Sequence, residues 1–144
     1  MKNTILLFGL LFLAITALKS NNIAVSAVSL IDQSAIQNHA NVKFDLSWDN
    51  SWRSAVVPGN WDAAWVFVKY RISGGEWHHG TLDTTAGVHV VPAGAELKGT
   101  PDGKGVFIYR SSNGSGSNAW TNIKLRWKYG ADGIPDDGAL EVRV

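Results

Sequence analysis

The chain has 144 residues, seven tryptophans, no cysteine and a net charge of +1 at pH 7. The missing cysteine excludes disulfides, thiolate metal sites, a cysteine nucleophile and a lipid anchor attached to cysteine. No block of like charge stands out, so neither nucleic acid nor an anionic membrane surface is an expected partner.

The N-terminus consists of Lys2 and two polar residues followed by an apolar run from Ile5 to Leu18. This run has the length of a signal-peptide core and is shorter than the roughly 20 residues of a membrane-spanning helix. We therefore predict that residues 1–20 are a signal peptide, cleaved near Ser20. An uncleaved anchor is the alternative. The remaining module, residues 21–144, is expected to be exported to the periplasm, the cell surface or the medium.

Apolar and polar residues alternate with a period of two through most of the remaining chain, and helical periodicity is missing. Residues 42–49, 123–129 and 140–144 alternate in the manner of half-buried strands. Residues 23–30, 77–82 and 105–110 are further short strands. In residues 65–72 we expect a central strand whose second face is covered at one end, over Trp65 and Phe67.

Turn signals separate these segments. Residues 73–76 indicate a tight hairpin, residues 101–105 a turn, and residues 111–118 and 131–138 two glycine-rich loops. The pattern predicts an all-β fold: an antiparallel β-sandwich of immunoglobulin or fibronectin-III type with seven or eight strands. A closed barrel is the alternative. Eight side chains should point inward and form one core: Phe44, Leu46, Trp48, Val66, Val68, Ile108, Leu125 and Trp127.

No catalytic constellation is recognisable, since no serine lies in a strand-to-helix elbow and no carboxylate pair is marked. The segment 130–138 contains Asp132, Asp136 and Asp137 among glycines. Carboxylates in a glycine-rich loop are possible ligands for calcium, although the spacing does not match an EF-hand. The alternative is that aspartate and glycine only form a turn. No other cofactor is expected.

A tryptophan-rich segment between two predicted strands is the candidate ligand site. Trp52 and Trp61 offer flat apolar rings in what we expect to be a loop, and the flanking polar residues are Asn50, Arg53, Asn60 and Asp62. If both rings are exposed, they form one aromatic surface for a glycan or a neighbouring protein domain. The alternative is that both rings cover the end of the core.

Residues 44–53 and 60–70, together with 105–110, 125–129 and 132–137, resemble the N-terminal module of exported Bacteroidetes-type proteins. In these proteins the module precedes a domain similar to formylglycine-generating enzymes, also called sulfatase-modifying factors. The resemblance covers nearly all of residues 21–144. It implies an accessory β-sandwich module, and no catalytic residue can be transferred, because the sequence stops at Val144 and has no cysteine.

These observations predict an exported, non-enzymatic accessory or interaction module. One alternative is a carbohydrate-binding domain that uses the loop tryptophans. The other is a fragment of a formylglycine-generating-enzyme-like protein, which a downstream reading frame with a cysteine-containing domain would reveal.

Overall fold

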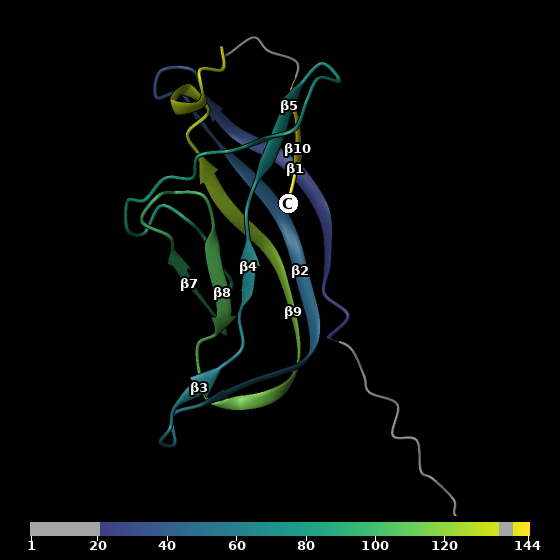
Figure 1. Ribbon diagram of the computed structural model, residues 1–144, viewed down its shortest axis with the longest axis vertical. Helices are drawn as coiled ribbons and strands as arrows, with labels where there is room; N and C mark the ends of the chain where they lie inside the picture. Colours follow the sequence, from purple (N-terminus) through teal and green to yellow (C-terminus); the bar gives the residue numbers. More distant parts are fainter. Residues whose placement is uncertain (1–20, 136–139) are drawn as a thin grey trace, which may run out of the picture.

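Strand β2 (His39–Ser54) is the longest element of the computed structural model, which describes residues 21–135 and 140–144. Every second side chain from Ala40 to Trp48 is buried, because successive residues of a strand point to opposite faces. β9 (Gly114–Trp127) pairs with one edge of β2, while β1 (Ala24–Ser34) and β3 (Asn60–Trp61) pair with the other. β2 and β9 lie side by side along the molecule (Figure 1). These four strands form the first sheet.

Two smaller antiparallel sheets contribute the rest of the fold. One has the order β4 (Ala64–Val66), β8 (Val106–Arg110), β7 (Ala95–Gly99). The other has the order β10 (Leu140–Arg143), β5 (Lys69–Ile72), β6 (His78–His79). A short 3-10 helix, η1 (Tyr129–Asp132), follows β9. The sheets stay open within the described residues, which confirms the prediction of an all-β, antiparallel, sandwich-like fold.

The core lies between the first sheet and the two smaller sheets. All eight side chains predicted to point inward are buried in a single cluster, which confirms that prediction. Aromatic contacts dominate its two ends: the rings of Trp48 and Trp120 meet edge to face at 5.1 Å, and those of Tyr70 and Trp127 stack at 5.0 Å. Such pairs add to the free energy gained from burying the rings.

A β-bulge decides which side chains of β9 reach this core. The register with β2 shifts between the pairs Phe44–Ile123 and Leu46–Trp120. Asn122 takes a φ of +58° at the shift, and its main-chain N–H donates to the Asp45 carboxylate at 2.9 Å. The extra residue allows both Trp120 and Ile123 to point inward, although their spacing is odd.

Several predicted strand boundaries are wrong. Residues 65–72 are not one strand but β4 and β5, which belong to different sheets. Trp65 is 58% exposed, so the expected cover over its face is missing. Of residues 77–82 only His78–His79 form a strand, and Leu82 makes an isolated bridge to Trp127.

The number of strands was also underestimated. The described residues contain ten strands rather than seven or eight, because β3 and β7 were not predicted and residues 65–72 form two strands. β9 begins inside the predicted loop 111–118, where glycine and serine residues pair with the end of β2. The hairpin at residues 73–76 and the turn at 101–105 are confirmed, since they join β5 to β6 and β7 to β8.

The predicted signal peptide, residues 1–20, lies outside the described residues. In the part of the chain that is described, no helix has the length and apolar character required to cross a bilayer.

Candidate functional site

Trp52 is 44% exposed and Trp61 is 48% exposed. Of the two alternatives above, exposed rings rather than rings that cover the end of the core, the structure has the first. Both lie in strands rather than in a loop, Trp52 in β2 and Trp61 in β3. Trp61 is paired with Arg53 across the two strands, so these two side chains share a face. Trp52 precedes Arg53 and therefore points to the opposite face. The expectation of one surface containing both indoles is thus corrected: they lie on opposite sides of the β2–β3 ribbon.

Each indole has one of the predicted polar neighbours beside it. The Trp52 indole N–H donates to the Asn60 side-chain oxygen at 2.8 Å. The guanidinium of Arg53 lies over the Trp61 ring at 5.2 Å and over the Tyr109 ring at 5.5 Å. The rings of Trp61 and Tyr109 are 6.0 Å apart. Trp61 is therefore joined to β8 through an aromatic and cationic cluster.

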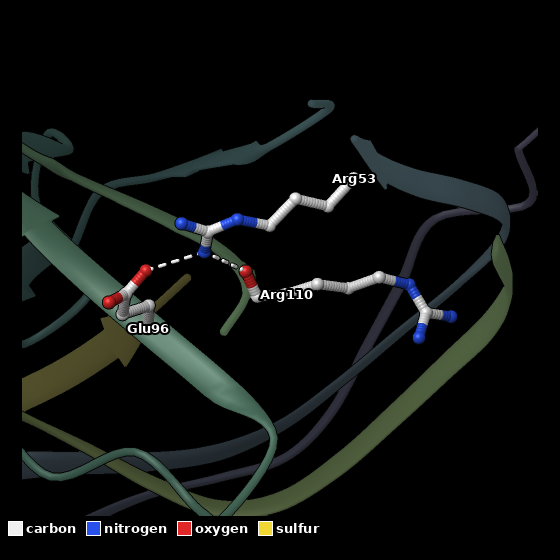
Figure 2. A network of polar contacts seen from close by, with 3 residues as sticks. All are labelled: Arg53, Glu96 and Arg110. Carbon is white, nitrogen blue, oxygen red and sulfur yellow. Dashed lines mark hydrogen bonds and ion pairs between the residues drawn. The ribbon is translucent and has the colours of Figure 1, made fainter. Parts of the chain in front are cut away.

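The guanidinium of Arg53 is held by two further contacts, which Figure 2 shows. It forms an ion pair with Glu96 of β7 at 2.6 Å and donates a hydrogen bond to the main-chain carbonyl of Arg110 in β8. The side chain of Arg110 points away from this carbonyl and donates to the carbonyls of Gly116 and Ser117 in β9. The two arginines thus fasten the β4–β8–β7 sheet to the end of the first sheet.

Asp62 has a structural position rather than one facing a ligand. Its carboxylate accepts hydrogen bonds from the Trp48 indole N–H at 2.7 Å, the Ser51 hydroxyl at 2.8 Å and the Trp52 main-chain N–H at 3.1 Å. Asn50 is exposed and has a φ of +56° beside a register shift in β2, a conformation that asparagine tolerates well. The four polar residues that were predicted to flank one ligand site therefore have separate structural roles.

A larger aromatic surface lies on the outer face of the β4–β8–β7 sheet. Trp65 of β4 is paired with Phe107 of β8, their rings are 6.4 Å apart, and both are exposed. Phe67 extends this group beside Trp65 at 5.5 Å. Tyr109 follows Phe107 by two residues on β8 and so shares its face. We call this surface the aromatic stripe; its rings are Trp61, Tyr109, Phe107, Trp65 and Phe67.

Charged side chains border the aromatic stripe on β7. Glu96 is paired with Tyr109 and Lys98 with Phe107, and both charged residues are exposed. His79, another exposed residue, lies 5.2 Å from the Phe67 ring at the other end. The stripe is accordingly a narrow apolar band with hydrogen-bonding groups along its margin.

The predicted calcium loop is only partly described. Asp132 lies in η1, where its carboxylate accepts from the Thr81 main-chain N–H at 2.8 Å, the Thr81 hydroxyl at 2.6 Å and the Trp127 indole at 2.7 Å. Asp136 and Asp137 lie outside the described residues. Among residues 21–135 and 140–144, no three carboxylate or imidazole groups gather where they could hold a metal ion. A cation at Asp132 would have to compete with three protein donors.

His89 lies in the segment between Leu82 and β7 and is half-buried. Its Nδ1 accepts the Arg126 main-chain N–H at 3.0 Å. Burial lowers the pKa of His89 below 6.5, and this effect outweighs the hydrogen bond and charge of Asp83, which raise it. The imidazole is therefore neutral near pH 7 and fastens the segment after Leu82 to β9.

Comparisons with family models, with curated proteins and with solved structures found no match for this chain.

Phe107 and Tyr109 are surface residues that were not predicted from the sequence. A signal was present, because Val106 and Ile108 alternate with them and are the buried residues of β8. Trp65 was assigned to a covered face because it is large and apolar. Whether a second layer covers such a face is decided by distant parts of the chain.

Proposed function

We propose that this chain is an exported, non-enzymatic accessory module that binds a glycan along the aromatic stripe. Export is supported by the apolar run of residues 5–18, which has the length of a signal-peptide core. The observation that supports glycan binding is the exposed pair Trp65–Phe107 with Tyr109 beside it, bordered by Glu96 and Lys98.

Sugar rings have apolar C–H faces and a rim of hydroxyl groups. The narrow row of aromatic rings can stack on the apolar faces, and the charged side chains of β7 can form hydrogen bonds with the hydroxyl groups. Four of the five rings lie in strands, and Phe67 lies between β4 and β5. The strands position the rings before a ligand arrives, so little ordering entropy is lost on binding.

A neighbouring protein domain is the other partner that the sequence suggested, and it matches the stripe less well. A stable protein interface covers about 800 Å² on each partner and has an apolar centre depleted of charge. Here Glu96 and Lys98 lie directly beside Tyr109 and Phe107, so the apolar band is only about one ring wide on that side.

The resemblance to the N-terminal module of formylglycine-generating-enzyme-like proteins fits an accessory role. In that setting the module would hold the partner domain near a glycan-rich surface. Calcium binding at Asp132, Asp136 and Asp137 remains a separate proposal, tested below.

The test is affinity electrophoresis through gels containing neutral polysaccharides, with Trp65→Ala and Phe107→Ala as the variants. Each should weaken retardation by at least about tenfold in affinity, the effect expected of a buried aromatic anchor. Trp52→Ala is the matched control, because its indole is similarly exposed but points to the opposite face. Equal loss in the control, or no retardation by any polysaccharide of the panel, contradicts the proposal. Melting curves of all variants verify that they are folded.

A further inference from the structure

The strand β7 has an edge that no other strand of the described residues covers. It is the last strand of its sheet and pairs only with β8. Open strand edges present unpaired main-chain donors and acceptors and are usually protected from other chains.

Two hydrogen bonds at the ends of the β7–β8 hairpin show which main-chain groups of β7 point away from β8. The Thr100 N–H donates to the Gly105 carbonyl, and the Ser111 N–H donates to the Gly94 carbonyl. Gly94 and Thr100 thus point toward β8, and the residues that alternate with them point away. The main-chain N–H and C=O groups of Ala95, Leu97 and Gly99 therefore point away from β8.

These outward groups repeat about every 7 Å along the strand. The Ala95 N–H is already bonded to the Pro92 carbonyl at 3.1 Å. For Leu97 and Gly99, no main-chain partner is present within residues 21–135 and 140–144. Leu97 is half-buried and Gly99 is exposed, so water reaches this edge.

A groove of about 540 Å³ runs along the same edge. Its walls are residues 95–101 on one side and residues 83–87, 89 and 91 on the other. Leu97, whose side chain packs against the core, and Lys98, whose side chain is on the other face of the sheet, both line the groove. The groove therefore follows the strand edge rather than one face of the sheet. Its volume is in the range of ligand-binding sites.

We propose that this groove binds an extended peptide segment of a partner protein, which adds to the β4–β8–β7 sheet as a fourth strand antiparallel to β7. Only an extended polypeptide main chain offers alternating donors and acceptors that match those of Leu97 and Gly99. The groove is bounded opposite β7 by residues 83–87, 89 and 91, so the occupant is a single strand rather than a second sheet edge.

The side chains of β7 specify the sequence of this peptide. Residues opposite Leu97 and Gly99 point to the inner side, where Val91 and Leu97 pack against the core, and should be apolar. Residues opposite Lys98 and Glu96 point outward beside those charges and should be acidic and basic, respectively. Read from its N-terminus, the preferred peptide is apolar, acidic, apolar, basic.

The probe is a labelled, end-blocked octapeptide whose central residues are valine, glutamate, valine and lysine, measured by fluorescence anisotropy. Gly99→Pro removes the outward N–H of residue 99 but no ladder hydrogen bond to β8, and proline is tolerated at such edge positions. A Cβ at residue 99 meets no atom within 4 Å, so the fold has room for the alanine side chain and for the Cβ of proline. Gly99→Ala keeps the N–H and is the matched control.

We expect Gly99→Pro to weaken peptide binding about tenfold, from one lost hydrogen bond and the steric block, and Gly99→Ala to leave it within about twofold. Exchanging glutamate and lysine in the peptide should weaken binding about two- to fivefold. Hydrogen exchange on the unmodified protein gives a second readout, in which the peptide should protect the Leu97 and Gly99 amides.

Three results overturn the proposal. The peptide fails to bind at millimolar concentration, or it binds Gly99→Pro as well as the unmodified protein without protecting these amides. In the third, light scattering shows that the unmodified protein forms a dimer that Gly99→Pro abolishes, which assigns the edge to a second copy of this chain.

Discussion

The carboxylate of Asp132 accepts the indole N–H of Trp127 at 2.7 Å, and so ties the short helix η1 to the largest fully buried side chain of the core. The same carboxylate receives the main-chain N–H and the hydroxyl of Thr81. Asp62 repeats this arrangement at the other end of β2, with Trp48 and Ser51 as donors. In both places an aspartate satisfies a buried indole that would otherwise lack a partner.

We expect Asp132→Ala to lower the free energy of unfolding by about 2–3 kcal/mol, because it leaves the Trp127 indole without an acceptor. Urea denaturation monitored by tryptophan fluorescence gives the value. Glu76→Ala, which removes an exposed carboxylate from the β5–β6 turn, is the control and should change stability by less than about 0.5 kcal/mol. Similar losses for both variants would mean that the Asp132 contacts contribute little.

Calcium binding at Asp132, Asp136 and Asp137 makes a separate prediction. An ion that binds only the folded state raises the melting temperature, and substituting all three aspartates by asparagine should abolish the rise. The comparison is made in millimolar calcium and in chelator. Identical melting curves for the unmodified protein in both conditions would leave only the structural role of Asp132.

Trp127→Ala should cost about 3–5 kcal/mol, since it opens a cavity where Tyr70 and Tyr129 now contact the indole. Trp52→Ala truncates the same type of side chain at a site that is 44% exposed, so we expect a loss of about 1 kcal/mol or less. Chemical denaturation of both variants provides the comparison. A small effect at Trp127 would contradict its place in the core.

His89 makes stability depend on pH. Because its folded-state pKa is lowered from 6.5, the unfolded chain takes up the proton first as the pH falls. The stability from neutral His89 is therefore fully present above pH 6.5 and is lost as the pH falls through the folded-state pKa. Melting temperatures between pH 7.5 and 5 measure the loss. His89→Gln, which can still accept from Arg126, should flatten this part of the profile; an unchanged slope would assign it to other groups.

The Arg53–Glu96 ion pair should contribute modestly. The two side chains are 22% and 48% exposed, so solvent weakens their attraction, but Arg53 also bonds to the Arg110 carbonyl. A double-mutant cycle with Arg53→Met and Glu96→Gln should give a coupling energy of about 0.5–1 kcal/mol that falls with added salt. Arg53→Met alone should cost more than Glu96→Gln, because it loses the carbonyl contact and the two aromatic contacts as well. Equal single costs would contradict that ranking.

The amount that sequence could reveal differed between the core and the surface. The alternation in residues 42–49 is strict, and it predicted the buried face of β2 because only one register hides Phe44, Leu46 and Trp48 together. The same reasoning failed at residues 65–72, because a continuous alternating pattern does not reveal that β4 and β5 join different sheets. β7 was missed since only Leu97 in it is a large apolar residue.

The candidate site shows the same division. The exposure of Trp52 and Trp61 was foreseen as one alternative, yet their opposite orientation depends on the pairing of Arg53 with Trp61. Phe107 and Trp65 come from strands about 40 residues apart in sequence and become neighbours only through the β4–β8 ladder.

The sequence by itself determined the all-β character, the turns at residues 73–76 and 101–105, and which alternating side chains must avoid water. These properties follow from local backbone preferences and from hydrophobic burial, which act within a few residues. Only the tertiary structure decided which faces remain uncovered and which strand edge stays open. Those outcomes depend on which distant strands pair, and the free energies of alternative pairings differ through contacts that no local pattern specifies.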